Sequence, residues 1–135
     1  GLATAHVYRE FDRRHPQPPP LPDLDTVRAL FATASPEQIA AAVANDLAPV
    51  AAALVPEIAV ALDAVRRSGA LAASVSGSGP TVFGLYRSRA EARTAAAALR
   101  AELPSGFEEP IVTAIADRST PAPALSVQGG TAGCA

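Results

Sequence analysis

The stretch that decides the fold is residues 69–86, which read GALAASVSGSGPTVFGLY. Two apolar runs, Leu71–Val75 and Val82–Tyr86, flank a centre rich in glycine and hydroxyl groups, Ser76–Thr81. The flanks predict two strands, because short apolar runs bounded by turn residues are typical of strands. The centre predicts a loop, because its glycines allow backbone conformations that other residues avoid.

This loop is also a candidate binding site, and its candidate contact residues are Ser76, Gly77, Ser78, Gly79 and Thr81. Successive backbone N–H groups in such a loop can form a concave anion site, and the hydroxyls add donors. One interpretation is a strand–loop–strand that binds a phosphate or another oxygen-rich group. The other is a glycine-rich hairpin turn without a ligand. Because the loop leads into a strand, no helix dipole assists it, and its spacing does not match a dinucleotide fingerprint.

The composition bounds the class of protein. With 135 residues, 49% hydrophobic residues and a net charge of −2, the chain fits a single globular domain. All of its 11 basic residues are arginine, so the chain cannot supply a phosphate-binding ammonium group, and their scatter gives no support for nucleic-acid binding. The longest apolar runs are too short to span a membrane, so we expect a cytoplasmic protein without a membrane partner. The single cysteine, Cys134, predicts neither a disulfide within the chain nor a metal cluster.

Cap and stop signals predict mainly helices before the glycine-rich stretch. Thr4 is the expected N-cap of the first helix, which ends before His15-Pro16. Ser35-Pro36-Glu37-Gln38 has the pattern of a capping box with proline at the first helical position, and Ser88–Glu91 has a second one. The expected helices cover residues 5–12, from Asp23 or Asp25 to about 33, 36–44, 47–54, 56–67 and 89–102. The proline-rich residues 16–22 are expected to form an extended surface insertion.

The fold class that follows is α+β. Ile111–Ile115 is β-branched and predicts a third strand, so we expect an antiparallel sheet of three strands covered by helices on one face. Three strands make a thin layer, and a fourth strand from the polypeptide before Gly1 is expected to complete it. An unpaired edge invites pairing with another chain, so a homodimer through this edge is also expected. We expect a domain over residues 1–118 and a disordered tail over 119–135.

Three segments carry a resemblance to a known family. Residues 69–85 resemble the third conserved motif of the GHMP kinases. Residues 2–12 and Asn45-Asp46-Leu47 narrow the resemblance to the branch that acts on a methylerythritol linked to cytidine diphosphate, in the non-mevalonate synthesis of isoprenoid precursors, in an actinobacterial style. The resemblance runs from residue 1 to about residue 117.

The resemblance implies a ferredoxin-like C-terminal domain of an ATP- and Mg²⁺-dependent kinase that phosphorylates a substrate hydroxyl. It implies that Tyr8 stacks on the cytosine ring of the substrate, with Thr4 and Ala5 nearby, and that the loop Ser76–Thr81 lines the cleft near the substrate's phosphates. It also implies a structural role for Asn45-Asp46 at a helix junction. The catalytic residues and the ATP-phosphate loop of the family belong to an N-terminal domain that is expected to be missing here, so we expect no kinase activity from this polypeptide alone.

Two alternatives remain at this point. The chain could belong to another GHMP kinase, of the homoserine or mevalonate type, which would not need Tyr8 at its position. It could instead be a free-standing ferredoxin-like module for ligand binding or interaction, with the proline-rich segment as a docking element. Cytidine-nucleotide binding that depends on Tyr8 separates the first alternative from the main hypothesis, and the sequence upstream separates the second.

Overall fold

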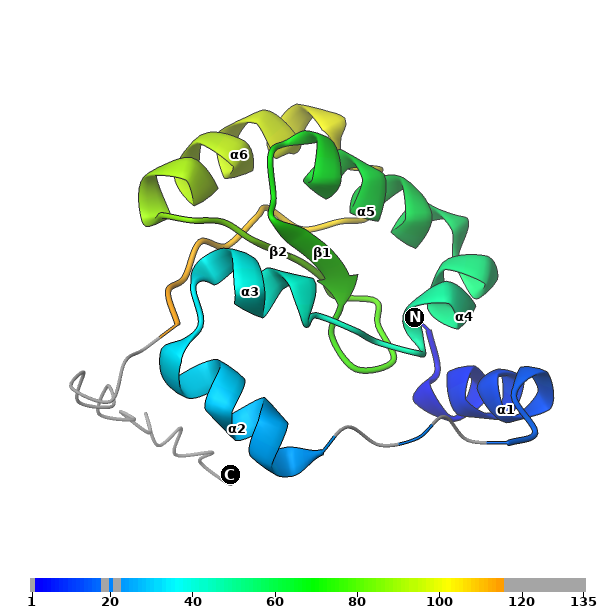
Figure 1. Cartoon of the computed structure of the whole chain (residues 1–135). Coiled ribbons are helices and arrows are strands. Elements are labelled where there is room, and N and C mark those ends of the chain that lie inside the picture. Colours follow the sequence, from blue (N-terminus) through cyan, green and yellow to red (C-terminus); the bar gives the residue numbers. More distant parts are fainter. Residues whose placement is uncertain (1, 18–19, 21–22, 116–135) are drawn as a thin grey trace, which may run out of the picture.

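The computed structural model describes residues 2–17, 20 and 23–115. In this part of the chain, five helices precede a β-hairpin and one helix follows it (Figure 1). The elements are α1 (Thr4–Arg14), α2 (Leu24–Thr33), α3 (Pro36–Ala41), α4 (Ala48–Leu54), α5 (Pro56–Arg67), β1 (Ala72–Val75), β2 (Val82–Leu85) and α6 (Arg89–Glu102). No helix in these ranges is long and apolar enough to cross a membrane.

The two strands predicted on either side of the glycine-rich loop are confirmed. β1 and β2 pair antiparallel, with Ala72 opposite Leu85 at one end and Val75 opposite Val82 at the loop end. Beyond the ladder, the backbone N–H of Ser76 donates to the carbonyl of Thr81 at 2.8 Å. This hydrogen bond joins the first and last residues of the loop, so the two ends of the loop are held together.

Helix α5 supplies the surface on which the hairpin rests. Its Ile58 and Leu62 pack with Ala51 of α4 and Val75 of β1 in one buried cluster. Val65, one turn further along α5, packs in a second cluster with Leu99 of α6. Figure 1 shows α5 and α6 running side by side over the hairpin. An isolated hairpin is marginal in water, so this helical support is what makes the hairpin stable.

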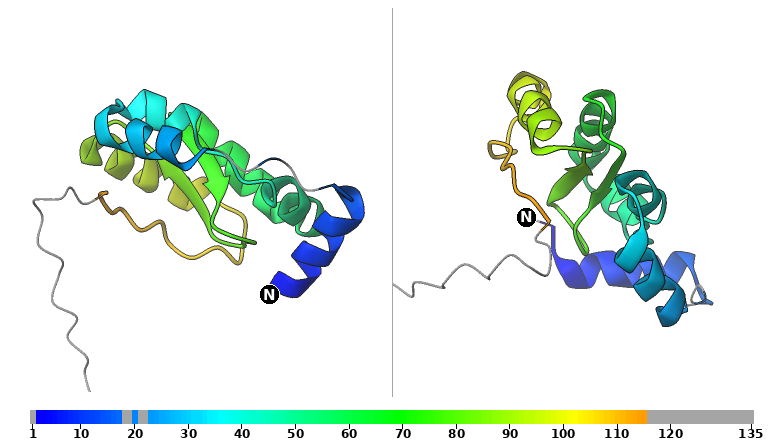
Figure 2. Two further views of the ribbon diagram at one scale, coloured as in Figure 1. Left: turned by 60° about the horizontal axis from the view of Figure 1, so that its bottom comes forward. Right: turned by 60° about the vertical axis from the view of Figure 1, so that its left-hand side comes forward.

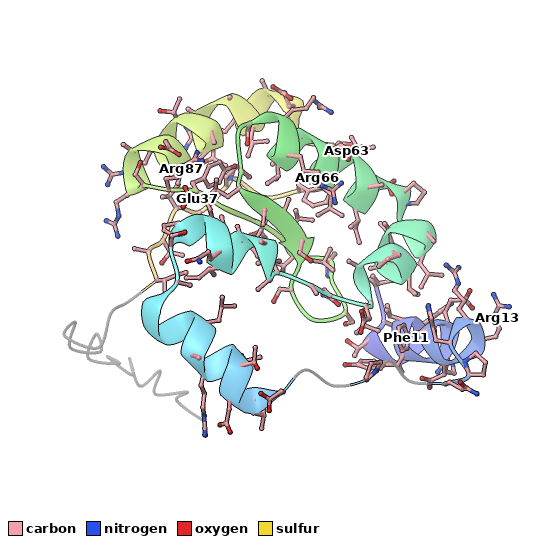
Figure 3. The ribbon with its side chains drawn as sticks, viewed as in Figure 1. Phe11, Arg13, Glu37, Asp63, Arg66 and Arg87 are labelled. Carbon is pink, nitrogen blue, oxygen red and sulfur yellow. The ribbon has the colours of Figure 1, made fainter. Side chains whose placement is uncertain are left out.

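Helices α1 and α2 lie further from the two strands. α1 packs against α4 and buries Val7 completely, whereas α2 packs against the short α3 (Figure 2). α3 is tied to the hairpin by an ion pair between Arg87 Nε and Glu37 Oε1 at 2.6 Å, two side chains that face each other in Figure 3.

Most of the predicted helix signals are confirmed. Ser35 and Gln38 form the complete capping box, with proline at the first helical position. Asp23 caps α2. The second predicted capping box is formed only in half: Ser88 accepts a hydrogen bond from the backbone N–H of Glu91, but no bond from the Glu91 side chain back to Ser88 is present among the described residues. The predicted N-cap at Thr4 is wrong: the N-cap of α1 is Ala3, and no side chain caps this end. The reason is that the Thr4 hydroxyl is engaged elsewhere, by a serine of the glycine-rich loop.

The predicted third strand is not formed in the part of the chain that the structure describes. The sheet has two strands, and residues 111–115 carry no strand assignment. Ile111 and Ile115 are 88% and 78% exposed, so their β-branched side chains gain no burial. Strand propensity acts through packing on neighbours, and this segment has no ladder partner beside it. It lies instead across a groove from β2.

Other predictions fall on residues outside the described ranges. The tail expected over 119–135 lies there entirely, as do residues 18–19 and 21–22 of the proline-rich segment. The fourth strand expected from upstream stays a prediction.

Gly84 of β2 generates a stability prediction, because a Cβ at this position would lie 2.6 Å from Val65 Cγ1. We expect Gly84→Ala to lower the free energy of unfolding by about 1–3 kcal/mol through overpacking, measured by urea denaturation. Val65→Ala removes the obstructing methyl group, so the double variant should lose less than the sum of the single losses. Additive losses would show that the contact between β2 and α5 is not the cause.

Candidate functional site

The loop between β1 and β2 is a tight, internally bonded turn. Besides the Ser76–Thr81 pair, the backbone N–H of Gly79 donates to the carbonyl of Ser76 at 2.9 Å. Gly77 and Gly79 have φ values of +55° and +82°, a region that residues with a Cβ rarely adopt. The Gly79–Pro80 peptide bond is cis. Ser76, Gly77 and Thr81 are exposed, and the hydroxyls of Ser76 and Thr81 are open to a ligand.

Ser78 points inward and joins the loop to α1. Its side chain is buried, and its hydroxyl donates to the hydroxyl of Thr4 at 3.0 Å across 74 positions of sequence. The loop lies beside the first turn of α1 in the view of Figure 1 and in both views of Figure 2. The structure therefore brings together two of the predicted site segments, which are far apart in the sequence.

Tyr8 lies on the same face of α1 as Thr4, because residues four apart on a helix are neighbours. Its side chain is 50% exposed. The neighbouring Val7 is fully buried and holds this part of the helix on the protein body. Thr4 and Ala5 are both exposed in the first turn. Helix α1 thus carries a half-exposed aromatic ring one turn after Thr4, the residue that bonds the loop.

Asn45 is the residue at this site that the sequence analysis underestimated. It lies between α3 and α4, as predicted for a helix junction. Its amide nitrogen also donates to the carbonyls of Val75 and Gly77, both at 2.8 Å, and its amide oxygen accepts from the backbone N–H of Leu47 at 2.9 Å. The signal in the sequence was an asparagine at a helix break, since its amide both donates and accepts. Nothing local in the sequence identifies the partners, which are 30 and 32 positions away.

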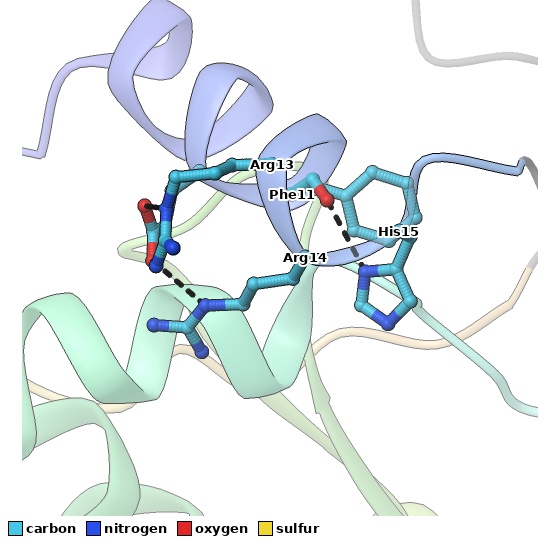
Figure 4. A network of polar contacts seen from close by, with 5 residues as sticks. Phe11, Arg13, Arg14 and His15 are labelled. Atoms are coloured by element: carbon cyan, nitrogen blue, oxygen red, sulfur yellow. Dashed lines mark hydrogen bonds and ion pairs between the residues drawn. The ribbon is translucent and has the colours of Figure 1, made fainter.

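Ion pairs stabilise the C-terminal end of α1. Glu10 accepts hydrogen bonds from Arg13 and Arg14 at 2.7 to 2.9 Å, as Figure 4 shows from close by. These two guanidinium groups lower the pKa of Glu10 to about 2. His15 ends the helix, with Nδ1 3.2 Å from the carbonyl of Phe11 and its ring stacked on the Phe11 ring. His15 therefore has a structural role at the C-cap of α1.

A groove runs along β2, between this strand and α6 on one side and residues 105–115 on the other. It is lined mostly by apolar side chains, and Leu2, Pro80 and Thr81 lie at its margin with the loop. Of the candidate site residues, Thr81 therefore lines the groove, whereas Thr4 and Tyr8 do not. No group of three or more His, Cys, Asp or Glu side chains in the described residues is arranged to hold a metal ion.

Fold and site together define an α+β domain whose helix-backed hairpin presents a glycine-rich loop to the start of a helix. Residues 27–105, more than half of the chain, match the family model described as "GHMP kinases C terminal". The chain belongs to this family, which confirms the fold class and the family resemblance.

Similar proteins extend the match. The chain is 46% identical over 101 residues to the 4-diphosphocytidyl-2-C-methyl-D-erythritol kinase of Thermobifida fusca, covering 75% of this chain and 33% of that protein. The protein of the same name from Salinispora tropica is 44% identical over 104 residues, covering 75% of this chain and 33% of the relative. The one from Rhizobium etli is 36% identical over 107 residues, covering 79% and 34%. The chain thus spans about a third of the length of these curated relatives.

The Glu10 network generates a prediction of pH dependence. The pKa of Glu10 in the folded protein is about 2, below the ordinary value of about 4.3 expected in the unfolded chain. The network therefore stabilises the fold above the unfolded value, and this contribution is lost as the pH falls from about 4 through about 2. An NMR titration of the Glu10 carboxyl should give a midpoint near 2.

Arg13→Gln should raise that midpoint, because it removes the largest cause of the shift. Arg9→Gln, on the same helix, is the matched control and should leave it unchanged. A midpoint at the ordinary value in the unsubstituted chain would contradict the network.

Proposed function

We propose that the chain is the substrate-side, C-terminal domain of a 4-diphosphocytidyl-2-C-methyl-D-erythritol kinase, which phosphorylates that substrate with ATP in the synthesis of isoprenoid precursors. The observation that carries the proposal is the hydrogen bond between Ser78 and Thr4, which joins the glycine-rich loop to the helix that carries Tyr8 one turn later. The names of the relatives support the same activity.

The chemistry of the site suits a substrate with a planar base and a diphosphate. The exposed face of Tyr8 can stack on a cytosine ring. The hydroxyls of Thr4, Ser76 and Thr81 and the backbone N–H groups of Ala5 and Gly77 are of the neutral kind that bind phosphate and hydroxyl oxygens. The N–H of Gly79 is already bonded to the carbonyl of Ser76. The proposed substrate-binding residues are therefore Thr4, Ala5, Tyr8, Ser76, Gly77, Ser78, Gly79 and Thr81.

ATP and Mg²⁺ do not fit this chain by itself. The chain has no lysine, and in the described residues no three His, Cys, Asp or Glu side chains gather where they could hold a metal ion. We assign the binding of ATP and its metal mainly to a further domain of the intact kinase, and catalysis with it. The residues here then bind and orient the substrate, and the 135-residue chain alone is inactive. A cytoplasmic location stays a prediction.

Two other functions fit the site less well. A GHMP kinase of the homoserine or mevalonate type would share the loop, but its substrate has no base to stack on Tyr8. A free-standing interaction module would use the proline-rich segment and would not need the contact between the loop and α1. The shared name of the relatives favours the cytidine-linked substrate.

Tyr8 gives the direct test of this function. Tyr8→Ala should weaken the binding of cytidine diphosphate to the chain by roughly 5- to 150-fold, because aromatic stacking on a base contributes about 1–3 kcal/mol. Tyr8→Phe should keep most of the affinity. Tyr86→Phe changes the only other tyrosine, which bonds Ser68, and is the matched control. Calorimetry measures the affinities, and an ATPase assay of the same sample should show no turnover.

Affinity that is unchanged in Tyr8→Ala would show that the ring does not stack on the base. ATP turnover by the purified chain would show that the catalytic groups are in this polypeptide.

The free edge of β2 supports the expected homodimer of the isolated chain. Because Ser76 and Thr81 form a bonded pair, the N–H groups of Val82 and Gly84 point away from β1, toward the groove. We propose that a second copy of the chain pairs with this edge whenever no further strand of the same polypeptide covers it.

Light scattering of the 135-residue chain should therefore show a monomer–dimer equilibrium that depends on concentration. Hydrogen exchange at Val82 and Gly84 should slow as the concentration rises, whereas exchange at Phe83, which faces β1, should not depend on it. A chain that stays monomeric at all concentrations would contradict the pairing, as would exchange rates at Val82 and Gly84 that do not change with concentration.

A further inference from the structure

Asn45 makes contacts that a helix junction alone does not require. Its amide nitrogen uses both of its hydrogens, one on the carbonyl of Val75 at the end of β1 and one on the carbonyl of Gly77 within the loop. Its amide oxygen accepts from Leu47, the N-cap of α4. One half-buried side chain therefore joins α4, β1 and the glycine-rich loop.

The bond to Gly77 fixes the orientation of a peptide group in the loop. In a trans peptide the C=O and the following N–H point in opposite directions. With the carbonyl of Gly77 held on Asn45, the N–H of Ser78 points away from the junction. The Ser78 hydroxyl, in the same residue, bonds Thr4. The orientation of this peptide group and the contact with α1 are therefore set together.

We propose that Asn45 is a positioning residue for substrate binding, which holds the loop in the conformation that meets α1. This inference rests on the proposed function. Asn45 need not touch the substrate, since it acts through the loop carbonyls. The glycines at 77 and 79 cannot hold the conformation by themselves, because glycine restricts the backbone least of all residues.

Asn45→Asp is the sharpest variant. A carboxylate still accepts from Leu47 and so keeps the junction, but it donates nothing and sets a negative oxygen against the carbonyls of Val75 and Gly77. Ser68→Ala is the matched control. It removes the bonds of the Ser68 hydroxyl to the carbonyl of Val65 and the hydroxyl of Tyr86, away from the loop at the far end of the hairpin.

In the intact kinase, Asn45→Asp should raise KM for the cytidine-linked substrate about tenfold or more, as expected for the loss of two hydrogen bonds. KM for ATP and kcat should change much less. The KM defect should shrink at low pH, where the introduced carboxyl is protonated and can donate again. Ser68→Ala should lower Tm without raising KM. A lowered Tm with unchanged KM in Asn45→Asp would overturn the proposal and leave Asn45 a structural residue only.

A second measurement separates this inference from the proposed function. If the unsubstituted kinase does not act on the cytidine-linked substrate, the function fails, and NMR spectra of the 135-residue chain then decide the role of Asn45. Asn45→Asp should shift the amide signals of Gly77, Ser78 and Gly79, and Ser68→Ala should not. Amide signals of the loop that stay in place in Asn45→Asp would overturn the inference.

Discussion

The arrangement of the site depends on how the loop Ser76–Thr81 is held. Two residues of this loop have positive φ, so its own backbone preferences do not define one conformation. Two side-chain anchors define it instead: the amide of Asn45 on one side and the hydroxyl pair of Ser78 and Thr4 on the other. Together these anchors join the loop to α4 and α1, and the position of Tyr8 follows from that of α1. Without these anchors, the loop and the aromatic ring would belong to unconnected parts of the surface.

The hairpin can hold this loop only because α5 holds the hairpin. Two strands bury little on their own. Gly84 lets β2 approach Val65 of α5 more closely than any residue with a Cβ could. Ile58 of the same helix is fully buried and lies against Gly79 in the loop, with its Cδ1 3.6 Å from the position a Cβ would take. One helix therefore supports both the strands and the loop, so the packing of the core and the geometry of the site are linked.

The sequence predicted those features that depend on neighbours in the chain. The capping box at Ser35 and Gln38 and the cap at Ser88 follow from residues three positions apart. The hairpin follows from two apolar runs around glycines. The failures are of another kind. Thr4 has the right chemistry for an N-cap, but a residue 74 positions away takes its hydroxyl. Residues 111–115 have strand propensity, but a strand needs a partner, and propensity does not name one. The predicted site residues stay a prediction, and only the fold shows that Thr4 meets Ser78 and that Asn45 joins α4 to the loop.

The distribution of charge bears on what such a site can do. Arginines 13, 14, 28, 66, 67, 87 and 100 each form an ion pair with a carboxylate of this chain. The loop itself offers only hydroxyls and backbone dipoles. Such neutral donors can orient a phosphate group, but phosphoryl transfer depends on positive charge to stabilise its transition state. A loop with such neutral donors can hold a substrate in place while positively charged groups of another part of the protein act on its phosphates. This lack of unpaired positive charge in the loop is why we propose that the domain contributes substrate binding to a kinase and that the charges for phosphoryl transfer come from elsewhere.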